Sequence, residues 1–246
     1  MTASGPRTRP AADLVVQRCR QLITCPGPAP RSGPRQTSID VVHDGAIASS
    51  AGRLVFAGAT ADLESSVDLV PGARVLDATG LSIVPGFVDA HTHAVFAGDR
   101  RDELRRRLSG ETYSQIAAAG GGIVATVRAT RNASEDDLVT ATRARLDEML
   151  ACGTTTCEVK SGYGLAVEPE LKMLRAVRRL NAAHDIDLVA TFLGAHEIPL
   201  EYRGRRQDYV DLVVKEMIPA VASDGLAEWC DVFCEEGVFT PEESLA

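Results

Sequence analysis

Two histidines separated by one residue, His91 and His93, follow a short apolar stretch at residues 86–90. Residues i and i+2 of an extended strand point to the same face, so the two imidazoles can approach one metal ion together. Zinc, iron and nickel all accept imidazole nitrogen as a ligand. The alternative is that both rings only make hydrogen bonds within the fold. Their position directly after an apolar strand favours metal binding, and we expect His91 and His93 to be metal ligands.

Further reactive side chains follow three later apolar stretches in the same way. They are Lys160, Ser161 and Tyr163 after residues 154–159, His196 and Glu197 after residues 188–193, and Glu235 and Glu236 after residues 229–234. Barrel enzymes form their active sites at the carboxyl ends of their strands. The sequence therefore predicts one site assembled from several strand ends, with Glu235 and Glu236 more typical of polar surface than of catalysis.

Helical patterns separate these four predicted strands. A capping pattern at Ser134–Asp137 begins one helix and Gly153 ends it, Pro169 is placed to begin a second, and residues 207–222 form a third that Pro219 kinks or ends. Strands that alternate with helices indicate a parallel βα architecture, either a doubly wound sheet or a (β/α) barrel. The glycines at 120–122 lack the spacing and setting of a dinucleotide-binding turn.

The first 85 residues have a different pattern, with short strands and turn signals and no helical period. Residues 45–48 and 53–57 flank a Ser-Ala-Gly turn and predict a hairpin. We expect residues 1–12 to be a disordered tail, residues 13–85 to be a partial β-sandwich domain with its first strand at Asp13, and residues 86–246 to be a separate βα domain.

Composition limits the class of protein. The 246 residues are 45% hydrophobic and carry 26 Lys+Arg against 34 Asp+Glu, a net charge of −8. This profile is typical of a globular chain with a core and excludes a largely disordered one. A net acidic chain is unsuited to general nucleic-acid binding, and no run of 18 apolar residues predicts a membrane span. We therefore expect neither a nucleic-acid nor a membrane partner.

The six cysteines show no C-x-x-C spacing, so the sequence contains neither a zinc-ribbon nor a thioredoxin motif. Without a signal peptide, the economical interpretation is a reducing cytoplasm and free thiols. Cys157, Cys230 and Cys234 lie in apolar, strand-like stretches, where we expect them to be buried as small hydrophobic side chains.

Several longer motifs resemble the imidazolonepropionases, a family of the amidohydrolase superfamily of metal-dependent hydrolases. The resemblance covers roughly residues 13–243, and its motifs occur in order at residues 84–93, 91–100, 120–131, 158–164 and 192–199. It implies a partial TIM-type (β/α) barrel of about four βα units preceded by a partial N-terminal β-sandwich.

The same resemblance implies the hydrolysis of 4-imidazolone-5-propanoate to N-formimino-L-glutamate, a step of histidine degradation, with one zinc or iron ion. His91 and His93 match metal ligands of the family, and Arg100, Tyr163 and His196 match substrate-contacting positions. An arginine fork suits a propionate carboxylate, and a phenol or imidazole can hydrogen-bond substrate oxygen or nitrogen. Lys160 could be a carbamylated lysine that bridges metal ions, as in some amidohydrolases. The resemblance to imidazolonepropionases argues against this role.

The family places a third histidine, an aspartate and the acid/base residues on later barrel strands, beyond Ala246, so the catalytic residues are unknown here. Residues 86–246 are also too few for a complete barrel of about 250 residues. We expect a truncated chain with little or no activity alone, a homo-oligomer, or a chain that pairs with a complementing C-terminal half. The other hypotheses are a different amidohydrolase, such as a deaminase or cyclic-amide hydrolase, and an inactive half-barrel interaction module.

Overall fold

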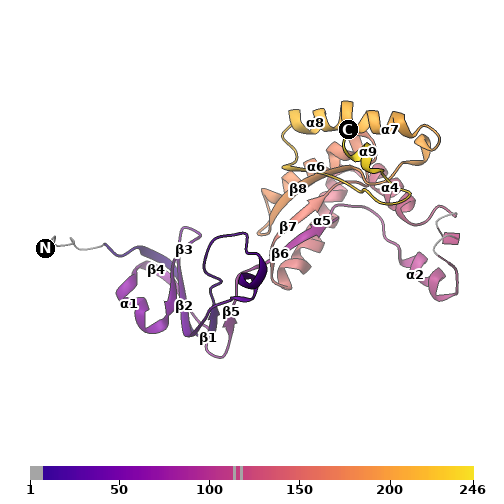
Figure 1. Ribbon diagram of the computed structural model, residues 1–246. Helices are drawn as coiled ribbons and strands as arrows, with labels where there is room; N and C mark the ends of the chain where they lie inside the picture. Colours follow the sequence, from indigo (N-terminus) through magenta and orange to yellow (C-terminus); the bar gives the residue numbers. More distant parts are fainter. Residues whose placement is uncertain (1–7, 113–114, 117–118) are drawn as a thin grey trace. The chain divides into compact units, whose positions relative to one another are not determined.

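The computed structural model describes residues 8–112, 115–116 and 119–246, which form two compact units, Met1–Pro85 and Gly86–Ala246. Figure 1 shows the elements of each unit along the chain. None of the described helices is long and apolar enough to cross a membrane.

The N-terminal unit contains one mixed five-stranded sheet in the order β3-β2-β1-β4, with β5 also paired to β1. Its strands are β1 (Ala11–Ile23), β2 (Val41–Ser50), β3 (Arg53–Ala59), β4 (Asp68–Asp77) and β5 (Ser82–Ile83). The predicted hairpin is confirmed: β2 and β3 are antiparallel, and both turn residues, Ala51 and Gly52, have positive φ. Two positive φ values define the tight turn whose twist matches the flanking strands.

Two expectations for the start of this unit need correction. The apolar segments at residues 14–16 and 22–23, on either side of a polar stretch, predict two short strands. In the structure β1 is continuous, because a bulge between Val16 and Cys19, with Arg18 at φ 60°, absorbs the polar stretch. The strand begins at Ala11 and Ala12 is fully buried, so a disordered tail of residues 1–12 is too long; residues 1–7 lie outside the described part.

The unit also contains helical turns, where the sequence predicted none. They are the 3-10 turns Gly33–Thr37 and Thr60–Asp62 and the helix α1 (Leu63–Ser66). Leu63 packs into a small core with Ala12, Val15, Ala46, Ala48 and Val67. The described strands of this unit form a single sheet, so a second sandwich layer is not present among them.

The C-terminal unit is a curled sheet of four parallel strands in sequential order, β6-β7-β8-β9. The strands are β6 (Phe87–Thr92), β7 (Thr154–Lys160), β8 (Asp187–Ala195) and β9 (Trp229–Val232). A doubly wound sheet reverses its strand order at a switch point, whereas a barrel adds each strand beside the last. The sequential order therefore selects the half-barrel from the two architectures that the sequence left open.

Helices connect the strands of this unit and cover one face of its sheet. They are α2 (Arg101–Leu108), α4 (Ile123–Asn132), α5 (Glu135–Ala151), α6 (Val167–Asn181), α7 (Arg206–Leu212), α8 (Ile218–Ser223) and α9 (Pro241–Ser244). In Figure 1, α5 and α6 lie along β7 and β8, which they contact. Leu138 and Leu146 of α5 and Met173 of α6 are fully buried against Val159 of β7.

The capping box predicted at Ser134 is present, with the Ser134 hydroxyl accepting from the Asp137 amide. Two other helix boundaries differ. α6 begins at Val167, so Pro169 is its third residue, a position whose N–H would have no partner within the helix anyway. The predicted helix at 207–222 is divided by a π-helical turn, Val213–Met217, directly before Pro219.

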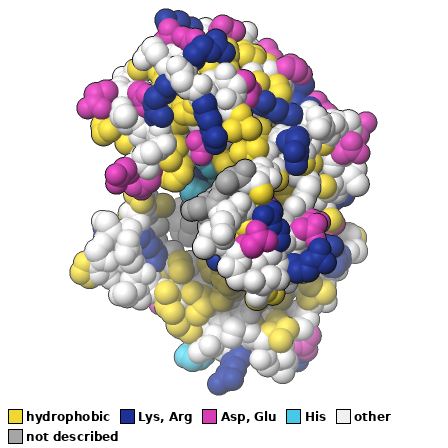
Figure 2. All heavy atoms as spheres, turned by 90° about the vertical axis from the view of Figure 1, so that its right-hand side faces the viewer, with side chains coloured by type: hydrophobic (Ala, Val, Ile, Leu, Met, Phe, Trp, Pro, Cys, Tyr) yellow, Lys and Arg dark blue, Asp and Glu magenta, His cyan; other side chains and the backbone are white. Residues whose placement is uncertain are grey.

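The strand expected at residues 229–234 is shorter than predicted, because β9 ends at Val232 and Cys234 makes only an isolated bridge to Phe239. Cys157 is buried as expected, but Cys230 and Cys234 are exposed, so the prediction of burial is wrong for these two. All six cysteines lie within the described residues and are free thiols. Figure 2 shows basic and acidic side chains interspersed, without a large patch of one sign on that face.

Candidate metal and substrate site

His91 and His93 lie at the carboxyl end of β6, as the sequence predicted. Between Asp89 and Thr92, β6 has one residue more than the segment of β7 with which it pairs. This extra residue forms a β-bulge next to His91. Bulges re-aim side chains and are frequent beside active sites. The two imidazole rings lie 5.7 Å apart between centroids, with His91 exposed and His93 partly buried.

His93 stacks on His196, which follows β8, with ring centroids 4.7 Å apart and an angle of 12°. Backbone carbonyls fix both rings: His93 Nδ1 lies 3.1 Å from the Ser161 oxygen, and His196 Nδ1 lies 2.8 Å from the Gly162 oxygen. A carbonyl can only accept, so each Nδ1 carries the hydrogen. In the neutral form, the Nε2 lone pair of each ring is then left for a metal ion or substrate.

Tyr163 lies beside both imidazoles, 5.1 Å from His93 and 5.3 Å from His196 between ring centroids. Burial raises the pKa of Tyr163 above its usual value, although the Arg100 charge opposes this, so the phenol keeps its proton at neutral pH. The sequence left open a loop-packing role for this residue. The structure brings it into the same cluster as the two histidines.

Arg100 and Tyr163 both line a cavity of about 330 Å³. The cavity is lined by Phe96, Asp99, Arg100, Thr126 and Tyr163. Arg100 Nε donates to the Thr126 hydroxyl at 3.1 Å, which fixes one edge of the guanidinium. The three histidines and Tyr163 therefore form one cluster of rings at the strand ends, and Tyr163 also lines the cavity that holds Arg100.

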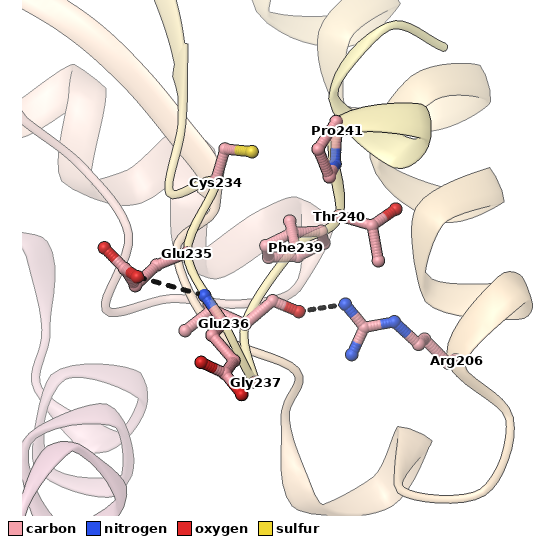
Figure 3. A pocket seen from close by; sticks show the side chains of 9 residues that line it. Arg206, Cys234, Glu235, Glu236, Gly237, Phe239, Thr240 and Pro241 are labelled. Atoms are coloured by element: carbon pink, nitrogen blue, oxygen red, sulfur yellow. Dashed lines mark hydrogen bonds between the residues drawn. The ribbon is translucent and has the colours of Figure 1, made fainter.

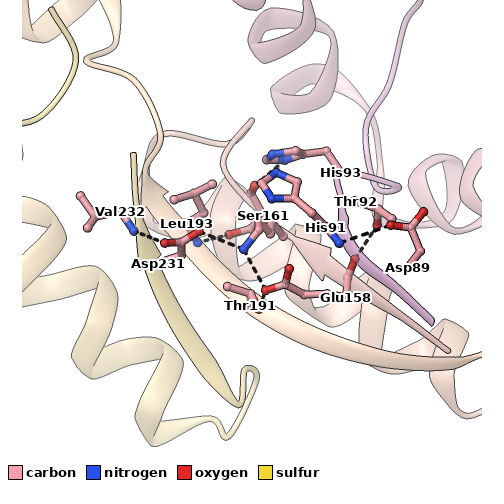
Figure 4. Close-up of polar contacts among 11 residues, drawn as sticks. Asp89, His91, Thr92, His93, Glu158, Ser161, Thr191, Leu193, Asp231 and Val232 are labelled. Carbon is pink, nitrogen blue, oxygen red and sulfur yellow. Dashed lines mark hydrogen bonds and ion pairs between the residues drawn. The ribbon is translucent and has the colours of Figure 1, made fainter. Parts of the chain in front are cut away.

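A largely buried charge network lies on strands β7, β8 and β9, close to His91 and His93 (Figure 4). The Lys160 ammonium, 7% exposed, donates to Glu158 Oε1 at 2.8 Å and to Asp231 Oδ2 at 2.9 Å. The Thr191 hydroxyl donates to the same Glu158 oxygen at 2.6 Å. Burial alone would lower the pKa of Lys160, but its two carboxylate partners outweigh burial and raise it. Lys160 is thus a paired cation, consistent with its omission from the predicted metal ligands.

Glu235 and Glu236 do not join this cluster. They line a separate cavity of about 460 Å³ with Arg206 and Cys234 (Figure 3), and both glutamates are exposed. Arg206 donates to the Val238 carbonyl and pairs with Glu243 Oε2 at 2.7 Å. The exposure of Glu235 and Glu236 fits the expectation that these two glutamates are polar surface.

The donor set for a metal ion is partial. His91 and His93 supply two imidazoles, but no group of three or more His, Cys, Asp and Glu side chains arranged to hold a metal occurs among the described residues. Burial, with the nearby charges of His196 and His91, lowers the pKa of His93 to about 4, so the ring is neutral at pH 7. Neutral imidazole is the form that binds metal, so the two residues fit part of a zinc or iron site.

Sequence reasoning missed the groups that hold these side chains in place. The carbonyls of Ser161 and Gly162 orient the imidazoles, and Thr126 orients Arg100. The only sequence signal for the loop was its pair of glycines. Thr126 stands inside α4, where nothing in the pattern distinguishes it from an ordinary helical residue.

The fold of this chain matches parts of two solved structures. The structure of E. coli guanine deaminase matches with a TM-score of 0.53 at 16% identity, covering 93% of this chain and 48% of that chain. An atrazine chlorohydrolase from Arthrobacter aurescens, solved in complex with zinc, matches with a TM-score of 0.51 at 16% identity, covering 94% and 48%. At such identities the likeness shows the fold alone.

Sequence comparison is more specific, although no protein-family model matches the chain. The imidazolonepropionase of Symbiobacterium thermophilum is 52% identical over 233 residues, which cover 94% of this chain and 55% of that protein. The imidazolonepropionase of Solibacter usitatus is 52% identical over 236 residues, covering 96% and 56%. The chain is thus a sequence relative of the imidazolonepropionases and spans little more than half the length of these curated relatives.

Proposed function

We propose that this chain carries part of the active site of a metal-dependent hydrolase that converts 4-imidazolone-5-propanoate to N-formimino-L-glutamate in histidine degradation. The observation that carries the proposal is a coincidence of sequence and geometry. Four of the five residues that match imidazolonepropionase motifs form one ring cluster, and Tyr163 of that cluster shares a cavity with the fifth, Arg100, in a chain 52% identical to proteins of that name. A deaminase or another cyclic-amide hydrolase would share the histidine pair but would need a different use for Arg100.

His91 and His93 would hold one divalent ion, zinc or iron, through two of the three protein ligands that a catalytic site normally has. When bound, such an ion lowers the pKa of a water molecule and so supplies a nucleophile at neutral pH. The Ser161 carbonyl would keep His93 in the tautomer that offers Nε2 to the ion. The remaining ligands would come from further barrel strands.

Arg100 would bind the propionate carboxylate of the substrate. Because its Nε is engaged by Thr126, the carboxylate would meet Nη1 and Nη2 in a bidentate pair. Tyr163 would donate its phenolic hydrogen to a substrate oxygen, and His196 would use Nε2 toward the ring. Phe96 lines the same cavity and would exclude water from one side of the imidazolone.

Four further βα units would complete the barrel, either in a continuous chain or in a complementing C-terminal half. The edge strands support this: Phe87 and Val88 of β6 are 58% and 67% exposed, and Trp229 of β9 is 65% exposed. We also propose that the N-terminal sheet is one layer of a sandwich completed in the same way. The six free thiols support a cytoplasmic location.

Metal binding tests the first half of the proposal. The purified chain would be stripped with a chelator, dialysed against Zn²⁺ or Fe²⁺, and assayed for bound metal. We expect uptake by the unaltered chain, loss in His91→Ala and His93→Ala, and no change in His43→Ala, which alters an exposed histidine of the other unit. No metal uptake by the unaltered chain, and no loss in His91→Ala, would favour the interaction module without metal.

Turnover tests the second half. The metal-loaded chain would be assayed with 4-imidazolone-5-propanoate, guanine and hydantoin, alone and with the C-terminal half of a related imidazolonepropionase. We expect little turnover alone and hydrolysis only of the imidazolone compound after complementation. Preferential hydrolysis of guanine or hydantoin would assign a different amidohydrolase activity, and full turnover by the isolated chain would refute the need for further strands.

A further inference from the structure

We propose that the Glu170 carboxylate is a positioning residue for this site, because it holds the loop after β7 that orients His93, Tyr163 and His196. The inference rests on the proposed function for the meaning of the site, but the contacts themselves do not depend on it. Glu170 lies in the first turn of α6 and touches none of the candidate ligands directly.

The Glu170 side chain is a fully buried carboxylate that accepts three backbone hydrogen bonds. Oε1 accepts from the Gly164 amide at 2.7 Å and from the Leu165 amide at 2.8 Å, and Oε2 accepts from the Gly162 amide at 3.0 Å. A carboxylate is the only common side chain that can accept on both ends at once.

Arg131 of α4 holds the same loop from the other side. Its Nε donates to the Gly164 carbonyl at 2.6 Å and its Nη2 to the Leu165 carbonyl at 2.8 Å. Loop residues Gly162 and Leu165 have φ of 105° and 48°. A positive φ is unfavourable for a residue such as leucine, so the loop needs contacts that hold it in this conformation. The two side chains together fix this path through three amides and two carbonyls.

The glycines in this loop permit its close approach to Glu170 and His196. A Cβ on Gly164 would lie 2.5 Å from the Glu170 nitrogen, and a Cβ on Gly162 would lie 2.8 Å from His196 Nδ1. The Cβ on Gly162 would also lie 2.8 Å from the Leu193 carbonyl oxygen, so at both positions the added atom meets backbone, which cannot move aside as a flexible side chain can. The spacing Gly-Tyr-Gly therefore places an aromatic residue between two positions at which only glycine fits.

The loop after β7 supplies groups that orient the candidate site residues, so its attachment to Glu170 affects the geometry of the site. The Ser161 carbonyl orients His93, the Gly162 carbonyl orients His196, and Tyr163 stands between them. The Gly162 peptide is the direct link, since its amide bonds Glu170 and its carbonyl bonds His196. A change in the Glu170 carboxylate is therefore transmitted to the His196 ring through one residue.

Glu170→Gln separates positioning from simple packing, because it keeps the size of the side chain. The amide oxygen can still accept from Gly164 and Leu165, but the amide nitrogen then faces the Gly162 N–H, donor against donor. The variant should release Gly162 selectively. Glu168→Gln is the matched control, since Glu168 lies on the same helix, is 71% exposed and, among the described residues, forms an ion pair only with Arg175.

The experiment uses the ¹⁵N-labelled full chain and compares amide hydrogen exchange and histidine ring ¹⁵N resonances in the three proteins. In Glu170→Gln we expect protection of the Gly162 amide to fall by about tenfold or more, with a shifted His196 ring resonance. Urea unfolding followed by Trp229 fluorescence shows whether the rest of the unit is intact. If Gly162 and His196 behave as in Glu168→Gln, the inference is wrong.

The unaltered chain provides a second test that does not require the variant to fold. The amides of Gly162, Gly164 and Leu165 should exchange far more slowly than that of Gly204, an open loop position. Equal exchange would refute the anchor.

Zn²⁺ and 4-imidazolone-5-propanoate are then added separately, to distinguish the anchor from the proposed function. A shifted His196 ring resonance in Glu170→Gln, without binding of either compound by the unaltered chain, upholds the anchor and refutes the proposed function. Binding with an unmoved His196 does the reverse.

Discussion

Replacing Lys160 with methionine should destabilise the C-terminal unit more than any change of an exposed lysine. Lys160 links Glu158 on its own strand to Asp231 on β9, and Glu158 in turn accepts from Thr191 on β8. Methionine has a similar length but no charge, so Lys160→Met removes the cation and leaves two carboxylates without their partner. The variant thus tests whether the network stabilises the association of the three strands or contributes little to the free energy of unfolding.

The magnitude follows from the burial of the three groups. Removing one partner of a fully buried ion pair costs about 3–5 kcal/mol, because the other charge remains desolvated. Here the side chains of Lys160 and Glu158 are 7% and 19% exposed, but that of Asp231 is 44% exposed and is partly screened by water. We therefore expect a loss of about 2–3 kcal/mol in the free energy of unfolding at pH 7.

Unfolding in urea, followed by fluorescence, provides the assay. Trp229 is the single tryptophan of the chain and lies on β9, two residues from Asp231, so its signal reports on this unit. Lys215→Met is the matched control, because Lys215 is 67% exposed and pairs with Asp211 within one helical segment. An exposed pair of this kind contributes about 0.3–0.5 kcal/mol.

The loss should also depend on pH. Burial disfavours ionisation, yet hydrogen bonds from Lys160 and Thr191 keep the pKa of Glu158 lowered, and the Lys160 bond likewise keeps the pKa of Asp231 lowered. A lowered folded-state pKa contributes stability above the unfolded value near 4, and this stability disappears as the pH falls through the folded value. The gap between the unaltered chain and Lys160→Met should therefore narrow below about pH 4.

Two results would refute this reasoning. If Lys160→Met is no more destabilising than Lys215→Met, the network behaves as a surface ion pair despite its burial. If the gap stays constant from pH 7 to pH 3, the lost stability comes from packing of the lysine stem rather than from the carboxylates. Adding Glu158→Gln to Lys160→Met should recover part of the loss, because it removes the uncompensated charge.

Three further outcomes test other contacts. Ser134→Ala should cost about 1 kcal/mol in urea unfolding by removing the capping box of α5, with Ser109→Ala, at an exposed helix end, as the comparison. Tyr209→Phe should cost about 1–2 kcal/mol, since the fully buried phenol donates to the Gly194 carbonyl at 2.7 Å; no change in the urea midpoint would contradict this. Thr126→Val, which keeps the shape but removes the acceptor of Arg100 Nε, should weaken binding of 4-imidazolone-5-propanoate by about tenfold in the complemented protein, seen as a higher KM at unchanged kcat.

The architecture of the C-terminal unit was predictable because its signals are local. Helices begin where a cap such as Ser134 occurs and end at a residue such as Gly153, and apolar stretches between them can only be buried strands. The errors fall where a backbone departs from the regular path without a change in composition. Arg18 turns a polar stretch into a bulge within one strand, and Pro219 is accommodated by a π-helical turn instead of ending the helix.

The candidate site was predictable to the level of which residues meet, but not of what holds them. Parallel strands in sequential order bring their carboxyl ends together, so His93, Tyr163 and His196 had to become neighbours once each was placed at a strand end. Their orientation depends on backbone carbonyls and on Glu170, which the sequence displays only as one acidic residue in the first turn of a helix. Acidic residues are common there for reasons of helix stability alone, so their presence does not distinguish an anchor.

The position of the histidine pair on an edge strand adds a physical asymmetry to the site. Tyr163 and His196 follow interior strands, and the loop that contains Tyr163 is fixed by Glu170 and Arg131, whereas among the described strands β6 is paired on one side only, to β7. His91 is accordingly exposed, and the neighbouring Phe87 and Val88 are largely solvent-accessible. The groups proposed to bind substrate are thus already oriented within this half-barrel. The groups proposed to bind metal would gain their missing ligands from further barrel strands and their rigidity from a strand added beside β6, so completing the sheet should raise metal affinity more than it changes the ring geometry of His196.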